Sequence, residues 1–134
     1  MDVHTRIAKA KIFIDDNYDR DLDLDKLCAE ACFSKFHFIR LFKRSYCRTP
    51  YQYLTERRIE KAKERLALGN ATVSEVCFDV GFESAPSFAL KFKSITGETP
   101  AVFRLRMMQT RALAKLQPRR FIPSCFSIMH CAEE

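Results

Sequence analysis

The strongest constraint on the fold is an internal repeat. The segment FKRSYCRTP at residues 42–50 returns fifty residues later as FKSITGETP at residues 92–100. Phe, Lys, Thr and Pro recur at the same offsets, and Phe38 recurs as Phe88 four residues before each segment. Internal similarity of this kind indicates one structural unit made twice. Because two copies are too few for a solenoid, the repeat predicts a pair of similar modules.

Helix signals dominate the chain. Apolar residues fall at helical spacing, and only three Gly and five Pro do not provide the frequent turns that an all-β chain needs. Thr49-Pro50 is a strong helix start, since Thr can cap, Pro suits the first helical position and Gln52 can complete a capping box. Thr72 with Glu75 predicts a second capping box. The sequence therefore predicts an all-α fold of seven helices and no strand.

Each copy of the repeat has the pattern of a short helix, a tight turn and a longer helix. The expected inner residues of the longer helices are Phe38, Leu41 and Phe42 in the first copy and Phe88, Phe92 and Ile95 in the second. This outline is typical of a helix-turn-helix, whose second helix enters the major groove of DNA. The predicted organisation is a helix-turn-helix subdomain at 1–49, a linker helix at 50–69, a second helix-turn-helix subdomain at 70–107, in which the last helix ends near Met107, and a tail without clean periodicity at 108–134.

The helix between the copies is a candidate spacer. From Pro50 to about Leu68 it would be ~27 Å long at ~1.5 Å per residue, and B-DNA repeats its major groove every ~34 Å. A rigid helix of this size can hold two modules in adjacent grooves on one face of the duplex. The repeat would then let a monomer do what a helix-turn-helix dimer does with two chains.

The positive charge is concentrated around the first copy. Residues 34–68 hold ten basic and three acidic side chains, whereas residues 1–33 hold five basic and eight acidic. A solvated helix face accounts for the basic residues that alternate with Glu along 60–65. It accounts less well for the basic residues without an acidic neighbour, which are Lys35, Arg40, Lys43, Arg44 and Arg48. A basic block of this kind indicates binding to a polyanion.

The order of these residues resembles the DNA-binding domain of the AraC/XylS family of bacterial transcription regulators. The matching positions of the first half and the linker are Ser34, Phe38, Arg40, Phe42, Lys43, Thr49, Pro50, Tyr53, Arg58, Ile59, Ala62 and Leu66. Those of the second half are Val76, Val80, Gly81, Phe82, Ser84, Phe88, Phe92, Lys93, Gly97, Thr99 and Pro100. The match covers roughly residues 5–107 and is far more specific than one short motif. It implies a sequence-specific regulator that inserts two recognition helices into adjacent major grooves of double-stranded DNA.

The resemblance places the base-contacting side chains of the first module on the outer face of its second helix, at Lys35, Phe36, Ile39, Arg40 and Arg44. Arg40 falls at the family's usual base-contacting arginine, and arginine forks onto guanine O6 and N7. Phe36 and Ile39 suit thymine methyl groups, and a core position for Phe36 is an equal alternative. The side chains expected to hold phosphates, which fixes register without reading sequence, are Ser34, Lys43 and Arg48.

The second module departs from the family pattern. Leu90 stands where the family usually has an outer-face arginine, and few donors remain beside it. The candidate base contacts are Ser87 and Lys91, and the candidate phosphate contacts are Ser84 and Lys93. The first module is therefore expected to dominate base reading, while the second mainly clamps the DNA backbone.

Catalytic, cofactor and metal sites are not indicated. The histidines are scattered, and the sequence has no nucleophile elbow, phosphate loop or metal triad, so neither an enzyme nor a cofactor is expected. Cys125, His130 and Cys131 match no standard zinc spacing and lack a fourth ligand. A redox- or metal-responsive DNA binder that uses these three residues is a minor alternative.

The remaining cysteines fit a reducing compartment. The first residues lack a secretory segment, and no apolar run reaches the ~18 residues of a membrane span, so the expected location is the cytoplasm, without disulfides. Cys28, Cys32 and Cys77 lie among apolar neighbours and are expected to be small buried residues. Cys47 replaces a glycine of the repeat, so a left-handed turn at this residue would be strained.

Two further expectations concern partners. Because Met1 lies directly before the first helix, the chain resembles the stand-alone branch of the family, which binds DNA as a monomer and is controlled by its abundance. An alternative is a protein-interaction regulator with weak DNA binding that acts on another regulator or on RNA polymerase. A contiguous apolar patch of Leu90, Phe121, Ile122 and Phe126 would favour that alternative.

Overall fold

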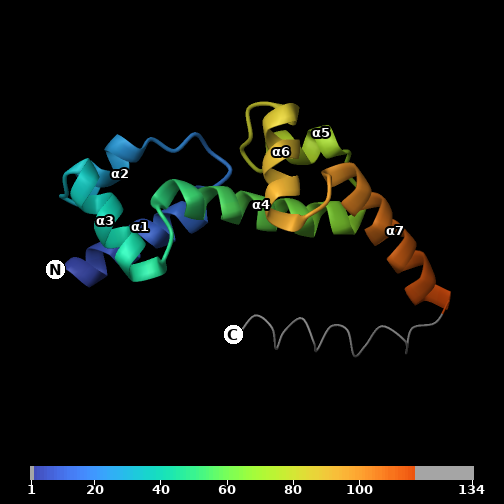
Figure 1. Cartoon of the computed structure of the whole chain (residues 1–134), viewed down its shortest axis with the longest axis horizontal. Coiled ribbons are helices and arrows are strands. Elements are labelled where there is room, and N and C mark those ends of the chain that lie inside the picture. Colours follow the sequence, from blue (N-terminus) through green and yellow to red (C-terminus); the bar gives the residue numbers. More distant parts are fainter. Residues whose placement is uncertain (1, 117–134) are drawn as a thin grey trace.

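The computed structural model describes residues 2–116, and within them the chain forms seven α-helices and no strand (Figure 1). In chain order they are α1 (Val3–Asn17), α2 (Leu24–Glu30), α3 (Lys35–Tyr46), α4 (Pro50–Leu68), α5 (Val73–Asp79), α6 (Ala85–Thr96) and α7 (Pro100–Leu116). The predicted all-α fold of two helix-turn-helix units joined by a long helix is confirmed. None of the described helices combines the length and the hydropathy that crossing a bilayer requires.

Side-chain caps start the helices where the sequence places them. Thr49 Oγ1 accepts the Gln52 N–H at 3.1 Å and Gln52 Oε1 accepts the Thr49 N–H at 3.0 Å, which completes the capping box of α4. At the start of α5, Thr72 accepts the Glu75 N–H at 3.1 Å. The return bond is not among the hydrogen bonds of the described residues, so α5 has a single cap rather than the predicted box. Pro86 lies in the first turn of α6, where its missing N–H removes no helical bond.

Two hydrophobic cores form, one toward each end of α4 (Figure 1). The first core lies among α1, α2 and α3, and α4 adds Leu54 to it. The second lies among α5, α6 and α7, and α4 adds Ile59, Ala62 and Leu66 to it. Since α4 contributes to both cores, it joins the two modules through its packing.

The aromatic repeat supplies the centre of each core. Phe38 and Phe42 are fully buried in the first module, and Phe88 and Phe92 in the second. The ring centroids lie 5.9 Å apart in the first pair and 5.7 Å in the second. Ile95 was expected on the same inner face but is 45% exposed. It lies in the last turn of α6, past the core, where two open grooves leave it uncovered.

The last helix is longer than the sequence predicts. α7 continues to Leu116 rather than ending near Met107, because residues 108–116 are rich in good helix formers and because this helix also contacts the end of α4. Arg111 donates a hydrogen bond to the Leu68 carbonyl oxygen, which is one of the acceptors that a helix end leaves unpaired. The rest of the predicted tail, residues 117–134, lies outside the described residues.

Both copies use left-handed residues at their turns, but with different chemistry. In the second copy these residues are Gly81, with a φ of 102°, and Gly97, with a φ of 89°. The first copy has Cys32 and Cys47 at the corresponding positions, each with a φ of 60°. The left-handed conformation costs a residue with a side chain roughly 1–2 kcal/mol. The strained turn expected at Cys47 is present, and Cys32 is exposed rather than buried as predicted, because it occupies the turn itself.

Replacing Cys47 with glycine is expected to raise the free energy of unfolding by about 1 kcal/mol, because relief of left-handed strain exceeds the entropy that glycine adds to the unfolded chain. Urea denaturation followed by circular dichroism measures the change. The reciprocal variant Gly97→Ala should lower the same quantity by about 1 kcal/mol. A Cβ at Gly97 meets no atom within 4 Å, so φ alone would cause this loss. A Cys47→Gly protein that is no more stable than the parent would contradict the strain.

Alkylation of the folded protein should separate the described cysteines into two classes. Burial raises the pKa of the Cys28 and Cys77 thiols, whereas Cys32 and Cys47 are exposed. Since the thiolate is the reactive form, iodoacetamide at mildly alkaline pH should modify the exposed pair first. Peptide mass spectrometry reads each site, and a urea-unfolded sample provides the control in which all four react. Equal alkylation rates of the four cysteines in the folded protein would contradict the burial of Cys28 and Cys77 in the two cores.

Candidate nucleic-acid interface

The outer face of α3 follows directly from its buried face. Phe38 and Phe42 point into the core, so residues two positions away lie on the opposite side of the helix. Phe36, Arg40 and Arg44 form one row at intervals of four residues, and all three are exposed. Phe36 is 79% exposed, so it is a surface residue rather than the core residue that the sequence left as an alternative.

Three of the cations on α3 are available to a ligand. Within residues 2–116, Arg40, Lys43 and Arg44 make no side-chain hydrogen bond or ion pair, and they line an open hollow of about 570 Å³ with His37 and Leu41. α3 has no acidic residue in its first turn. Within the described residues these three cations therefore have no direct acidic partner, as suits a polyanion-binding surface.

The other predicted residues of the first module are partly engaged. Lys35 Nζ lies 3.8 Å from Asp25 Oδ1, and Ile39 is half-buried at the edge of the outer face. Arg48 donates from Nε to both carboxylate oxygens of Glu56, at 2.8 and 3.0 Å. Exposed pairs of this kind contribute only ~0–1 kcal/mol, so a phosphate can replace the carboxylate at little cost.

α6 presents the same geometry with different chemistry. Phe88 and Phe92 are its buried row, and Leu90 occupies the position that corresponds to Arg40. Leu90 is 74% exposed, so the outer row of α6 has an apolar side chain where α3 has a guanidinium group. Ser87 and Lys93, predicted as contacts, are also exposed on this helix.

The serines before the two helices act as caps. Ser34 Oγ accepts the His37 N–H at 3.4 Å, and Ser84 Oγ accepts the Ser87 N–H at 3.3 Å. In this arrangement each hydroxyl uses only its acceptor function. Its own O–H therefore stays available as a donor at an exposed helix N-terminus, the kind of position that favours a phosphate group.

An open groove joins the two modules across α4. Its volume is about 430 Å³, and the polar side chains that line it are Lys43, Arg48, Tyr51, Gln52, Thr55, Glu56, Lys91 and Ser94. Lys91 thus lies at the flank of α6 that faces the first module. The groove brings together Lys43, Arg48 and Lys91, which come from both modules. Sequence reasoning missed Gln52 and Thr55, because the helical pattern of α4 alone does not show which of its sides faces this groove.

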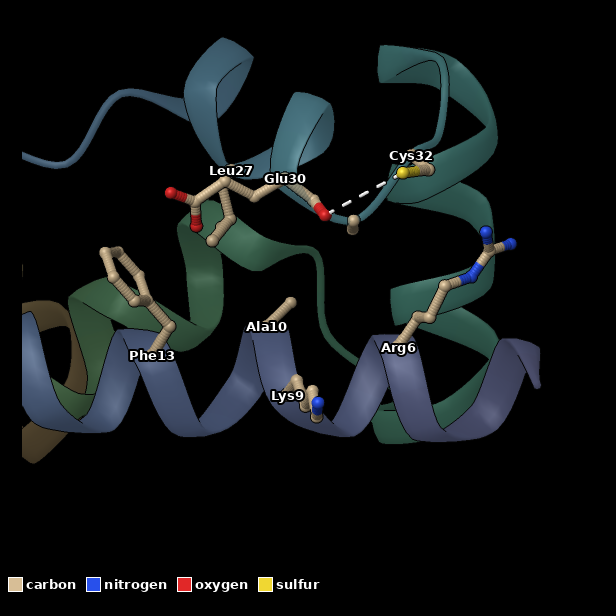
Figure 2. A pocket seen from close by; sticks show the side chains of 8 residues that line it. Arg6, Lys9, Ala10, Phe13, Leu27, Glu30 and Cys32 are labelled. Atoms are coloured by element: carbon tan, nitrogen blue, oxygen red, sulfur yellow. Dashed lines mark hydrogen bonds between the residues drawn. The ribbon is translucent and has the colours of Figure 1, made fainter. Parts of the chain in front are cut away.

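A second hollow lies between α1 and α2 (Figure 2). It encloses about 420 Å³ and is lined by Arg6, Lys9 and Phe13 of α1 and by Leu27 and Glu30 of α2. In Figure 2 Arg6 and Phe13 extend from α1 toward the side on which α2 lies. None of the predicted DNA contacts lines it. Its walls mix apolar carbon with charges of both signs, so it differs from the basic surface of α3.

Metal binding has no support in the described part of the chain. No group of three or more His, Cys, Asp or Glu side chains is gathered there in a way that could hold an ion. Cys125, His130 and Cys131 lie outside the described residues, as do Phe121, Ile122 and Phe126 of the apolar patch considered above.

Comparison with known proteins gives relatives that share this helix order. A family model described as a helix-turn-helix domain matches residues 27–106. The transposon Tn10 TetD protein of Escherichia coli is 35% identical over 102 residues, which cover 75% of this chain and 74% of TetD. Some other matched regulators are longer: the match spans 30% of the regulator ArgR of Pseudomonas aeruginosa, which is 27% identical over 97 residues.

Solved structures share the fold. The DNA-binding domain of AdpA, a global transcriptional factor crystallised with a target DNA, superposes with a TM-score of 0.71 at 25% identity, over 84% of this chain and 96% of that domain. A probable AraC family transcriptional regulator from Rhodopseudomonas palustris superposes with a TM-score of 0.70 at 24% identity, over 77% of this chain and 97% of that protein.

Proposed function

Since this chain belongs to the AraC family of helix-turn-helix DNA-binding transcription regulators, we propose that α3 and α6 enter adjacent major grooves on one face of a DNA duplex. The observation that carries this proposal is the groove shared by α3, α4 and α6, which places cations of both modules on one side of the linker helix. A major groove accepts one α-helix. Both recognition helices then bind within one chain, so the protein acts on DNA as a monomer.

The first module reads the bases in this proposal. Arg40 and Arg44 supply free guanidinium groups, Lys35 supplies an amine, and Phe36 and Ile39 supply apolar surface for thymine methyl groups. In the second module, Ser87 and Lys91 are the polar groups assigned to bases, beside the apolar Leu90. The difference between Arg40 and Leu90 at corresponding positions supports unequal base reading by the two modules.

The phosphates lie along the edges of the two helices and between them. Ser34 and Ser84 hold phosphates at the helix starts, and Lys93 does so at the last turn of α6. Lys43 and Arg48 hold phosphates in the shared groove, where Arg48 exchanges Glu56 for the DNA. Contacts of this kind set the register of the protein without reading sequence.

We also propose a cytoplasmic location and RNA polymerase as a protein partner, since a regulator on DNA acts on transcription through the polymerase or by excluding it. The hollow between α1 and α2 is a candidate contact because it is open and lies outside the predicted DNA face. A protein-interaction regulator with weak DNA binding is the second candidate function, favoured by the exposed Leu90 on α6. The family consists of transcription regulators, and we propose no catalytic role.

Selection from a random pool of ~20-base-pair duplexes at two salt concentrations tests the proposal. The expected product is one motif that spans two adjacent major grooves, bound with a salt dependence that corresponds to ~5 or more phosphate contacts. Enrichment of one half-site only would restrict base reading to the first module. Weak, salt-sensitive binding without enrichment would overturn the proposal and favour the protein-interaction alternative.

Replacing Lys93 with alanine should weaken binding without changing the preferred sequence, because phosphate contacts carry no sequence information. Since Lys93 is assigned to a phosphate at the last turn of α6, the slope of log affinity against log salt should fall by about 1. Titrations at several salt concentrations measure this slope. Lys9→Ala, which removes the same charge from the side of the hollow on α1, is the matched control and should leave the slope nearly unchanged. A loss that depends on the bound sequence would assign Lys93 to the bases instead.

A further inference from the structure

Arg58 connects the two modules through the backbone of the first. Its Nε donates to the Tyr18 carbonyl oxygen at 2.7 Å and its Nη2 donates to the Arg20 carbonyl oxygen at 2.8 Å. Both acceptors belong to the loop that follows α1, forty and thirty-eight residues before Arg58. Burial lowers the pKa of the guanidinium group from its ordinary value, although an arginine remains charged in a protein. The bonds therefore form in a partly desolvated environment, where they are stronger than in water.

The turn of the second module lies beside these bonds. A Cβ on Gly81, at the turn between α5 and α6, would lie 2.8 Å from the Tyr18 carbonyl oxygen and 2.9 Å from Arg58 Nε. The Phe82 ring centroid lies 5.9 Å from the Arg58 guanidinium carbon. In Figure 1 the loop between α1 and α2 extends toward the turn between α5 and α6. Because Gly81 has no Cβ, the turn between α5 and α6 can lie against both the Arg58 guanidinium group and the loop that follows α1.

Other parts of the molecule support a special role for this contact. The Tyr18 side chain packs against both hydrophobic cores. The neighbouring arginines of α4 have carboxylate partners instead. Arg65 donates to Asp79 at 2.6 Å within the second module. Arg57 donates to Glu60 at 2.7 Å within α4 and lies 3.4 Å from Asp15 of α1. Arg58 differs because its partners are carbonyl groups of a loop, which its planar fork can hold in one orientation.

We propose that Arg58 is a positioning residue that holds the first module against the turn of the second and thereby determines which spacing of half-sites the protein accepts. α4 also holds the first module through Leu54 and through Asp15 of α1, which pairs with Arg57 and accepts from the Tyr53 hydroxyl. Within the described residues, none of these groups is among the atoms nearest to a Cβ on Gly81. The bonds from Arg58 are received on a loop that lies against Gly81 of the second module, so they restrict rocking of one module against the other. The consequence for DNA rests on the proposed binding of two adjacent grooves, whereas the fixed orientation of the modules does not.

A spacing series on DNA tests the consequence. The probe is the duplex selected from the random pool, with one or two base pairs inserted or deleted between its half-sites. The parent protein should lose about tenfold or more in affinity at the wrong spacings, which corresponds to about 1.4 kcal/mol. Arg58→Ala should bind the best site more weakly and lose only about twofold on changing the spacing. A merely destabilised protein would bind every spacing more weakly by one factor, and that result would overturn the proposal.

Two further variants define the contact. Arg65→Ala removes an arginine of the same helix that bonds only inside the second module, so it should retain the parent's spacing preference. Arg58→Lys can donate to one carbonyl but cannot hold both in a fixed plane, and it should recover part of the preference. Equal spacing profiles for Arg58→Ala and the parent would show that the contact does not position the modules.

Residual dipolar couplings test the orientation without DNA. In the parent, one alignment tensor should fit the amides of α2, α3, α5 and α6 together. In Arg58→Ala, each module should need its own tensor, because motion of one module against the other averages the couplings of the two modules differently. A single tensor in the variant would overturn the proposal even if DNA selection succeeds. If the DNA selection fails but Arg58→Ala still needs two tensors, the proposed two-groove binding is wrong and the positioning role of Arg58 stands.

Discussion

Replacing Arg40 with alanine is expected to weaken binding to the selected DNA site by about 1–3 kcal/mol and to relax specificity at one base position. The guanidinium group is exposed in the centre of the outer row of α3 and forms no ion pair within residues 2–116, so its donors are free to fork onto guanine. A polarisation titration on the selected duplex, repeated with each base substituted at each position, measures both effects.

The corresponding position of α6 provides the matched control. Leu90→Ala alters the same point of the second recognition helix, which has no charged group there, and should cost less than Arg40→Ala and leave the base preference of the first half-site unchanged. The expected division between the modules would be contradicted if alanine at Lys91 and Lys93 reduced sequence discrimination more than alanine at Arg40. Unfolding curves of each variant separate loss of binding from loss of structure.

Replacing Phe92 with alanine is expected to lower the free energy of unfolding by about 3–5 kcal/mol. Its ring is fully buried, with centroids 5.7 Å from Phe88 and 5.4 Å from Phe103, so truncation leaves a cavity between α6 and α7. A typical domain has only ~5–15 kcal/mol of stability in total, and this loss is therefore close to the largest that one side chain can cause. Urea denaturation measures it.

Ile95→Ala, one turn further along α6, is the control for this experiment. Ile95 is partly exposed, so the variant should lose about 1 kcal/mol or less. Hydrogen exchange provides a second measurement on Phe92→Ala. Because the two cores are separate, the amides of α5 and α6 should lose protection before those of α2 and α3. A uniform loss across both modules would mean that the cores unfold as one unit.

Most of the helical organisation could be predicted because it depends on neighbours within one turn. Thr49 and Gln52 cap α4 as expected, since both partners lie within four residues of each other. Phe38 and Phe88 are buried as expected, because apolar residues at helical spacing share one side of their helix and that side packs into the core. The repeat and the family resemblance added the outer face of α3, where Arg40 and Arg44 lie exposed.

The errors concern residues whose surroundings come from distant segments. Ile95 has inner-face spacing, yet nothing covers the last turn of α6. The end of α7 was placed too early, because its bond from Arg111 to Leu68 spans forty-three residues. The second capping box was predicted from spacing alone, which does not report the rotamer of Glu75. For Ile95 and the end of α7 the tertiary environment decided the outcome, whereas the rotamer of Glu75 is a local feature that spacing does not determine.

The sequence by itself therefore determined the two modules, their helices, the buried aromatic rows and the basic face of α3. Tertiary structure decided how the modules face each other: Lys91 shares a groove with Lys43 and Arg48, and Arg58 meets the Tyr18 carbonyl beside Gly81. The physical reason is the range of the interactions. Periodicity and caps act over three or four residues, whereas the contacts between modules join groups that are twenty or more residues apart and become neighbours only after both cores have formed.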